Sequence, residues 1–213
     1  FIQNRVNGAH FFSPSGLSFT IERDEHVALV VNRALLDRFL AKQAAQAGAH
    51  LMLNSKVESI ERVGGGILLS GNFGTIKADV AVDAEAVASH FTREMGLQPL
   101  MMEDLLPALQ YDLKGVDIDP RYVEVHVGRS IAPSFFAWVI PLNESSVRIG
   151  LACKGDNPRE KLEQFMKKRF NDRVNLTRVH VRSGLIVTSG PISRTFCDNF
   201  LAVGDVARQV KPT

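Results

Sequence analysis

The sequence has few cysteines, and none of them belongs to a recognisable motif. Cys153 and Cys197 lie far apart, without CxxC spacing and without a nearby pair of histidines. We therefore expect two buried, reduced thiols in a cytoplasmic protein, with a disulfide or a metal site as the alternative. HExxH spacing and a serine nucleophile elbow are also missing, which argues against a metal site and against a hydrolase.

Long hydrophobic runs and an excess of one charge are missing as well. A membrane-spanning helix needs about 18 or more apolar residues in a row, and the sequence has no such run. The 25 Lys and Arg residues nearly balance the 23 Asp and Glu residues, so the net charge of +2 gives no electrostatic indication of nucleic-acid binding. The sequence starts at Phe1 without a signal-peptide pattern and ends abruptly at Thr213, so we expect a part of a longer protein.

What the sequence does have is enough apolar content for a core. With 213 residues and 45% hydrophobic content, it can form one large domain or two small ones. An apolar run at 27–31, a helical pattern at 33–47 with Asn32 as N-cap and Gly48 after its end, and a strand at 50–53 follow one another. Strand, helix, glycine and strand in this order are typical of a nucleotide-binding sheet.

Strand patterns fill most of the remaining sequence. A hairpin is expected at 9–12 and 17–21, and a β-meander at 56–63, 67–70 and 75–78, in which Gly64 to Gly66 form a hairpin turn rather than a phosphate loop. Alternating apolar and polar residues predict a further antiparallel sheet at 108–113, 122–127, 135–140, 147–151 and 178–181. A helix begins at Asn157-Pro158, with an apolar stripe formed by Leu162, Phe165, Met166 and Phe170.

Three stretches resemble one known family. They are the strand and turn Phe200 to Asp205, the helix Val31 to Leu40 with the later Ala47-Gly48-Ala49, and Pro133 to Pro141. The last stretch is similar to the motif Pro-x-x-Tyr-x-Trp-x-Phe-Pro. Together they resemble the geranylgeranyl reductase family, including the digeranylgeranylglycerophospholipid reductases, among the FAD-dependent oxidoreductases related to p-hydroxybenzoate hydroxylase.

The resemblance implies a fold and its division into domains. The fold class is α/β with mixed α+β character: a partial Rossmann-like domain for FAD or NAD(P), with an inserted antiparallel sheet for the substrate. Residues 1–104 are expected to form the partial FAD-binding domain, with a hairpin of the substrate domain near 9–31. Residues 105–182 are expected to form the substrate domain, and 183–213 to return to the FAD-binding domain.

The resemblance also implies the residues of two sites. In the cofactor site, Arg33 is expected to hold the pyrophosphate of FAD, the backbone of Val57 the adenine, and Gly204 with Asp205 the ribityl or pyrophosphate part. In the substrate site, four residues are expected to line an isoprenoid cavity: Pro133, Phe136, Trp138 and Pro141. From the residues alone, Arg33 is equally a solvated cation at a helix start, and the apolar strand face of Phe136, Trp138 and Ile140 is equally part of an ordinary core.

The sequence departs from the family pattern at several positions. Leu36 replaces a Phe, Glu85-Ala86 replaces an Asp-Gly turn, and Arg208 stands where relatives usually carry glycine. The first GxGxxG unit is absent. The missing GxGxxG unit, Glu85-Ala86 and Arg208 favour the alternative of a non-catalytic relative that binds hydrophobic ligands but does not retain FAD.

The expected function is the reduction of carbon–carbon double bonds in geranylgeranyl chains of lipids or prenyl precursors, with NAD(P)H or a ferredoxin as electron donor. A flavin-dependent monooxygenase or halogenase of the same superfamily is the alternative enzyme. The resemblance implies an isoprenoid lipid as partner and peripheral contact with a membrane. The basic helix residues Lys161, Lys167, Lys168, Arg169 and Arg173 form either a solvated face or a patch for anionic lipid.

Overall fold

The computed structural model of the protein describes residues 1–88, 90–170 and 177–211. The chain divides into two compact units, each built from two separate segments. Unit 1 comprises Phe1–Ala49 and Pro107–Gly184, and unit 2 comprises His50–Leu106 and Leu185–Thr213. Residues 1–49 thus form one compact unit with the large sheet, and this segment includes the hairpin near 9–31 that the resemblance assigns to the substrate domain. The functional assignment of the three expected segments stays a prediction.

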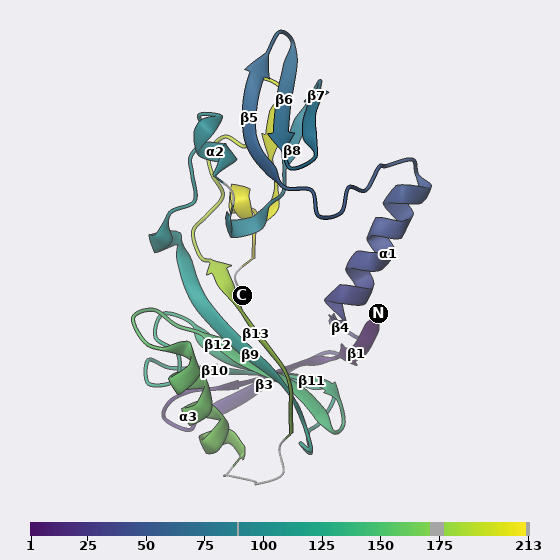
Figure 1. The fold of residues 1–213 in the computed structure, drawn as a ribbon. Helices are drawn as coiled ribbons and strands as arrows, with labels where there is room; N and C mark the ends of the chain where they lie inside the picture. The colour runs from purple at the N-terminus through teal and green to yellow at the C-terminus, as the bar shows by residue number, and fades with distance from the viewer. Residues whose placement is uncertain (89, 171–176, 212–213) are drawn as a thin grey trace. The chain divides into compact units, whose positions relative to one another are not determined.

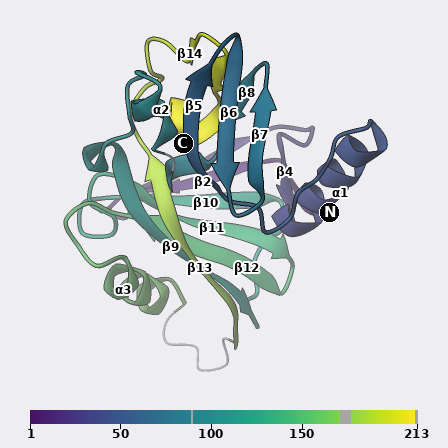
Figure 2. The ribbon, with the colours of Figure 1, turned by 45° about the horizontal axis from the view of Figure 1, so that its top comes forward.

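Unit 1 is built around a seven-stranded sheet with the strand order β13-β9-β12-β11-β10-β2-β3 (Figures 1 and 2). Its strands are β2 (Gly8–Phe12), β3 (Ser18–Glu22), β9 (Leu105–Lys114), β10 (Tyr122–Val127), β11 (Phe136–Asn143), β12 (Ser146–Ala152) and β13 (Thr177–Val187). The expected hairpin of β2 and β3 and the antiparallel pairing of β9 to β12 are confirmed. One join is parallel, because β2 pairs with β10 in the same direction.

Helix α3 (Pro158–Phe170) covers one face of this sheet (Figure 2). The four residues of its expected apolar stripe are all buried, and they pack against alternate residues of β9, β11 and β12 such as Tyr111, Val139 and Ile149. Asn157 accepts a hydrogen bond from the backbone N–H of Arg159 at 2.9 Å, which stabilises the helix start. Burial of the stripe therefore fixes α3 to one face and leaves the other face of the sheet uncovered by this helix.

The expected basic patch on α3 is not one solvated surface. Arg169 donates from Nε to the buried carboxylate of Glu124 at 2.7 Å, and Lys161 pairs with Asp156 at 3.2 Å. Lys167 and Lys168 are exposed, and Arg173 lies outside the described residues. Tertiary contacts thus divide the cluster between ion pairs and solvent.

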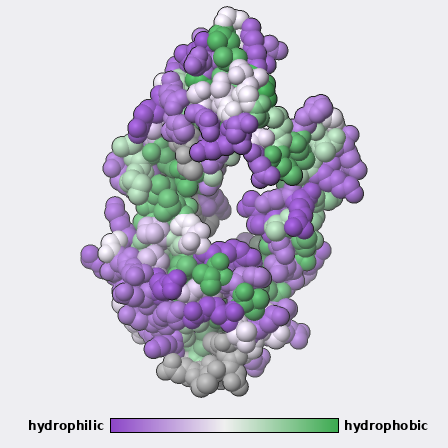
Figure 3. Space-filling view, in the orientation of Figure 1, coloured by the Kyte–Doolittle hydropathy of each residue, from purple (hydrophilic) through white to green (hydrophobic). Residues whose placement is uncertain are grey.

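Unit 1 also contains the pair β1 (Ile2–Val6) and β4 (Ala28–Val31), followed by α1 (Arg33–Gln46). The helix begins as predicted, because the Asn32 side chain accepts a hydrogen bond from the N–H of Leu35 at 3.3 Å, and Gly48 follows its end with φ 96°. No residue of α1 is buried. Three apolar side chains are nevertheless exposed along it: Leu35, Phe39 and Leu40. In Figure 3, green hydrophobic atoms lie among purple ones where Figure 1 draws α1.

Unit 2 contains two small sheets. The expected meander is confirmed as β5 (Val57–Val63), β6 (Gly66–Gly71) and β7 (Gly74–Ala78), with a tight turn at Gly64-Gly65. The second sheet has the order β14 (Phe196–Cys197), β15 (Phe200–Ala202), β8 (Ala81–Asp83), and β15 runs parallel to β8. Short helical segments η1 (Ala86–Ala88), α2 (Phe91–Glu94), η2 (Met102–Asp104) and η3 (Gly204–Ala207) complete the unit.

The expected strand at 50–53 is wrong. These residues form no strand, and Leu51, Met52 and Leu53 are all more than half exposed. A strand requires a neighbour that accepts and donates its backbone hydrogen bonds, and no strand that the structure describes pairs with this segment. The apolar composition of 50–53 therefore predicted a β-strand, but the described part of the chain has no neighbouring strand to pair with it.

Candidate functional site

Strand β11 presents its side chains to two different environments. Ala137 and Val139 are fully buried in the core beneath α3, whereas Phe136, Trp138 and Ile140 are only partly buried. Successive side chains of a strand point to opposite faces of the sheet, so the latter three share the face opposite α3. The predicted grouping of these three residues on one strand face is confirmed.

Cross-strand register extends this face over three further strands. Val125 of β10 lies opposite Trp138 on one side and Phe11 of β2 on the other. Phe11 lies opposite Phe19 of β3, and the two rings stack with centroids 4.9 Å apart. Paired residues of neighbouring strands point to the same side of a sheet. The aromatic face is therefore defined by six side chains: Phe11, Phe19, Val125, Val127, Phe136 and Trp138.

Gly150 of β12 makes room for the indole of Trp138. The two residues are paired in the sheet, and a Cβ at position 150 would lie 2.6 Å from Cζ2 of Trp138 and 2.7 Å from Cβ of Gln110. Real carbon atoms do not approach so closely, so a side chain at this position would displace the indole. Glycine at 150 thus sets the position of the largest ring on the aromatic face.

Beyond Gly150 the same sheet face becomes charged. Arg148 of β12 donates to the buried carboxylate of Asp112 at 2.8 and 3.2 Å, and Arg182 of β13 donates to it at 2.9 Å. Burial by itself would raise the pKa of Asp112, but the two arginines outweigh burial and hold the pKa below its ordinary value. Asp112 therefore remains ionised and neutralises one of the two cations.

The two prolines of the expected substrate site occupy different places. Pro133 lies in the turn before β11, lines a cavity, and accepts a hydrogen bond from the N–H of Lys154 at 3.0 Å. Pro141 is buried on the α3 side of β11, opposite Val147. Of the four expected residues, the structure brings Phe136 and Trp138 together on the aromatic face, places Pro133 beside its edge, and places Pro141 on the other face.

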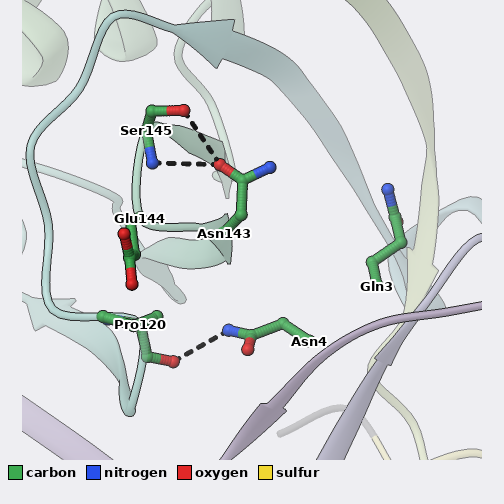
Figure 4. Close-up of a pocket in the computed structure, with 6 residues that line it drawn as sticks. All are labelled: Gln3, Asn4, Pro120, Asn143, Glu144 and Ser145. Carbon is green, nitrogen blue, oxygen red and sulfur yellow. Dashed lines mark hydrogen bonds between the residues drawn. The ribbon is translucent and has the colours of Figure 1, made fainter.

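A second cavity of unit 1 is polar and contains none of the predicted residues. It has a volume of about 380 Å³, and Asn4 and Asn143 form hydrogen bonds within its wall (Figure 4). The amide of Asn4 donates to the carbonyl of Pro120 at 2.8 Å, while Asn143 accepts from the backbone and side chain of Ser145. The polar groups of this wall thus already have hydrogen-bond partners within the protein. A polar wall of this kind does not form a recognition site for an apolar ligand.

The expected cofactor residues are divided between the two units. Arg33, at the start of α1 in unit 1, has a side chain that is 75% exposed and pairs with Asp37 at 3.3 Å. Val57 begins β5 in unit 2 and is half-buried against its core. Gly204 and Asp205 follow β15 in unit 2. Sequence resemblance selected these positions, and their contact with FAD stays a prediction.

The Gly204-Asp205 turn has the features of a surface that a ligand approaches closely. Gly204 has φ 73°, and no atom lies within 4 Å of the place that a Cβ would occupy. Asp205 is half-exposed, and no described residue forms a hydrogen bond or an ion pair with its carboxylate. An open backbone beside a carboxylate can accept hydrogen bonds from the hydroxyl groups of a ligand that approaches this turn.

Sequence reasoning missed most of the aromatic face. Phe11 and Phe19 were recognised as hairpin residues and Val125 as a strand residue, without any link to Trp138. The alternating patterns did indicate which residues share a face within each strand. The parallel join of β2 to β10 is what brings them together, and no local signal encodes that join.

The described residues contain neither a disulfide nor a group of three residues that could hold a metal ion. Cys153 is buried, Cys197 is half-buried, and both are free thiols. Every described helix is also too short or too polar to span a bilayer. Among the described residues, the features that bear on ligand binding are thus the aromatic face and the glycine turns.

Several known proteins are similar to this chain in sequence. Residues 104–186 match the family model of the geranylgeranyl reductase catalytic domain. The chain is 32% identical to digeranylgeranylglycerophospholipid reductase 2 of Methanothermobacter thermautotrophicus, covering 100% of this chain and 57% of that protein. It is 31% identical to the digeranylgeranylglycerophospholipid reductase of Methanocaldococcus jannaschii, covering 100% of this chain and 56% of that protein.

Solved structures show the same fold. A geranylgeranyl bacteriochlorophyll reductase-like protein from Thermoplasma acidophilum matches with a TM-score of 0.86 and 27% identity, over 100% of this chain and 57% of that chain. The halogenase PltM matches with a TM-score of 0.76 and 17% identity, over 98% of this chain and 48% of that one, which shows a shared fold alone. The chain spans a little over half the length of the curated relatives it matches. Over the part of its relatives' length that it spans, the chain is thus similar to the geranylgeranyl reductase family.

Proposed function

We propose that the protein containing this chain is an FAD-dependent oxidoreductase that reduces carbon–carbon double bonds of geranylgeranyl chains in lipids or prenyl precursors. The observation that carries this proposal is the aromatic face of the unit 1 sheet. It is apolar across four neighbouring strands, it lies opposite α3, and its two largest side chains in β11, Phe136 and Trp138, fall within the matched catalytic-domain segment.

The chemistry of an isoprenoid chain fits this face. Such a chain offers no hydrogen-bonding groups, so binding depends on burying its carbon atoms at about 0.8 kcal/mol for each buried methylene. Aromatic and β-branched side chains supply a wide apolar wall, and the glycine at 150 keeps the indole of Trp138 close to the sheet. Long substrates gain more contact than short ones, which favours a polyprenyl chain over a small aromatic ring.

FAD, when bound and reduced, supplies the hydride for the alkene, and a proton completes the saturation of the double bond. Within this chain, Arg33 is proposed to pair with the pyrophosphate and the backbone of Val57 to meet the adenine. Gly204 lets the ribityl chain approach the backbone, and Asp205 accepts hydrogen bonds from its hydroxyl groups. Either NAD(P)H or a ferredoxin is proposed to reduce the flavin.

The curated relatives are named as reductases of digeranylgeranylglycerophospholipids, which are membrane lipids. Peripheral contact with a membrane is proposed through the β2–β3 hairpin. Leu17 at its tip is 76% exposed, and Phe19 and Ile21 of β3 are 60% and 51% exposed. Apolar residues gathered at a hairpin tip can enter the headgroup layer of a bilayer and bring the aromatic face close to its substrate.

The test uses the full-length protein with its flavin. The flavin is reduced without oxygen, a digeranylgeranyl glycerophospholipid is added, and the return of oxidised flavin absorbance is followed together with the mass of the lipid. We expect reoxidation of the flavin and the gain of two hydrogen atoms for each reduced bond. Both are expected to be slowed by Trp138→Ala and unaffected by Lys168→Ala, which changes an exposed side chain of α3. Failure of the protein to retain flavin, or oxygen-dependent hydroxylation or halogenation of an aromatic substrate in place of lipid reduction, would contradict the proposal.

A further inference from the structure

A cavity of about 550 Å³ lies at the start of β11, beside the aromatic face. It is formed by the turn between β10 and β11 and by the residue that follows Cys153 after β12. Its lining combines two cations with small and aromatic groups: Arg129, Lys154, Ala132, Pro133, Ser134 and Phe135. A cavity with positive and apolar walls is suited to an amphiphile with an anionic end.

The backbone holds this cavity in one shape. The N–H groups of Ile131 and Ala132 donate to the carbonyl of Gly128 at 3.0 and 2.9 Å, and the N–H of Lys154 donates to that of Pro133 at 3.0 Å. Ser134 has φ 68°, a left-handed conformation that is unfavourable for a residue with a side chain. The turn is thus maintained by two local hydrogen bonds to Gly128 and one tertiary bond from Lys154, against the conformational preference of Ser134.

The two cations of the cavity are uncompensated. No residue that the structure describes forms an ion pair with Arg129 or Lys154. Several other cations of unit 1 have carboxylate partners: Arg148 and Arg182 share Asp112, Arg169 pairs with Glu124, and Lys161 pairs with Asp156. The cavity wall therefore carries two cations that have no carboxylate partner among the described residues.

Stacked rings connect the cavity to the aromatic face. Phe135 lines the cavity, and its ring stacks on that of Phe136 with centroids 4.3 Å apart and planes 16° apart. Phe136 meets Trp138 edge to face at 6.1 Å. A ligand whose anionic end lies between Arg129 and Lys154 can therefore extend its apolar part along an unbroken aromatic path.

We propose that this cavity is a subsite for the phosphate-bearing head of the prenyl substrate, and that Arg129 and Lys154 select phosphorylated prenyl lipids over neutral prenyl alcohols. The inference rests on the proposed function, because it needs the isoprenoid chain on the aromatic face. Guanidinium and ammonium groups bind phosphate oxygens through charge-assisted hydrogen bonds, and both residues can contact one phosphate in a shared cavity.

The test uses the 213-residue chain, in which Trp138 is the only tryptophan, so its fluorescence reports on the aromatic face. Geranylgeranyl phosphate, geranylgeraniol and inorganic phosphate are titrated separately. We expect the phosphate ester to bind about tenfold more tightly than the alcohol, which corresponds to about 1.4 kcal/mol. The double variant Arg129→Gln, Lys154→Gln is expected to remove this preference while leaving the affinity for the alcohol unchanged.

Matched variants decide the location of the subsite. Lys167→Gln with Lys168→Gln removes two exposed cations of α3 and is expected to preserve the preference. A different result would overturn the proposal: if Arg182→Gln removes the preference and the double cavity variant keeps it, the phosphate binds beside Arg182 and Asp112 and not in the cavity. Competition by inorganic phosphate as strong as that of the ester would also overturn it, because the cavity would then bind free anions.

The outcomes separate this inference from the proposed function. If the alcohol and the ester both alter Trp138 fluorescence with equal affinity in the unmodified chain, the subsite is wrong and the apolar binding face stands. If neither ligand alters it, both the subsite and the proposed use of the aromatic face are wrong.

Discussion

Arg208 and Asp104 form a buried ion pair in unit 2, with 2.8 Å between Nη2 and Oδ2. Their side chains are 8% and 12% exposed, and the same guanidinium nitrogen donates to the carbonyl of Pro99 at 2.8 Å. Arg208 follows η3 in a left-handed conformation with φ 56°. Arg208, at the position where the resemblance implies a glycine, therefore has a structural role, because its side chain joins the turn after Gly204-Asp205 to the segment around η2.

The first prediction concerns this pair. Asp104→Asn is expected to destabilise the chain by about 3 kcal/mol, because it leaves the guanidinium of Arg208 buried without a countercharge. Urea unfolding measures the loss. Asp198→Asn, which removes an exposed carboxylate of the same unit, is the matched control and is expected to change stability by less than about 0.5 kcal/mol. Equal effects of the two variants would show that the pair does not stabilise the fold.

The second prediction concerns Ala86, which has φ 60° where the family pattern has glycine. Ala86→Gly removes the strain of a left-handed alanine, which stabilises the folded state by about 1–2 kcal/mol. Glycine also gives the unfolded chain more conformational entropy, which lowers stability by about 0.5–1 kcal/mol. We expect a net gain of up to about 1 kcal/mol, measured by thermal or urea unfolding. The same substitution in α1, Ala34→Gly, is expected to lose about 1 kcal/mol, because glycine is unfavourable inside a helix. A loss at both positions would refute the strain at Ala86.

The third prediction concerns Glu124, which is buried between Arg169 and His126. Burial alone would raise the pKa of Glu124, but the hydrogen bonds and charges of Arg169 and His126 outweigh it and lower the pKa to about 2. The folded state then binds this proton less readily than the unfolded state, whose pKa is near the ordinary 4.5. The contribution of Glu124 to stability is complete above about pH 4.5 and is lost as the pH falls towards 2.

Unfolding measured across this pH range checks that contribution. Glu124→Gln is expected to remove the part of the acid dependence that belongs to this group, about 3 kcal/mol for a shift of this size. The exposed Glu144→Gln leaves the dependence in place. If Glu124→Gln leaves the change of unfolding free energy with pH unaltered, other carboxylates cause the acid dependence.

The fourth prediction concerns the contact between Gly150 and Trp138. Gly150→Ala places a methyl group against the indole, and we expect a loss of about 1–3 kcal/mol in stability together with a shift of the tryptophan emission. Binding of a prenyl ligand to the aromatic face is expected to weaken as well. Gly184→Ala is the control, since nothing lies within 4 Å of the added Cβ. Unchanged emission in Gly150→Ala would show that the indole does not rest on this glycine.

Local patterns were sufficient wherever the structure depends on neighbours in sequence. The cap by Asn32, the end of α1 at Gly48, the bounds of β10 and the buried stripe of α3 follow from hydrogen bonds and periodicities within a few residues. The same patterns failed at 50–53, where an apolar run resembled a strand but no described strand pairs with it. Strand formation depends on a partner, and a partner is not a local property.

The sequence by itself determined which residues share a face of each strand, since alternation follows from backbone geometry, and family motifs identified Phe136 and Trp138. Only the tertiary structure decided which strands are neighbours. The parallel pairing of β2 with β10 joins Phe11 to the aromatic face across more than a hundred residues of sequence, and the pairing of β9 with β12 joins Asp112 to Arg148. Long-range pairing depends on the packing of the whole core, so these contacts leave no pattern in any single stretch of sequence.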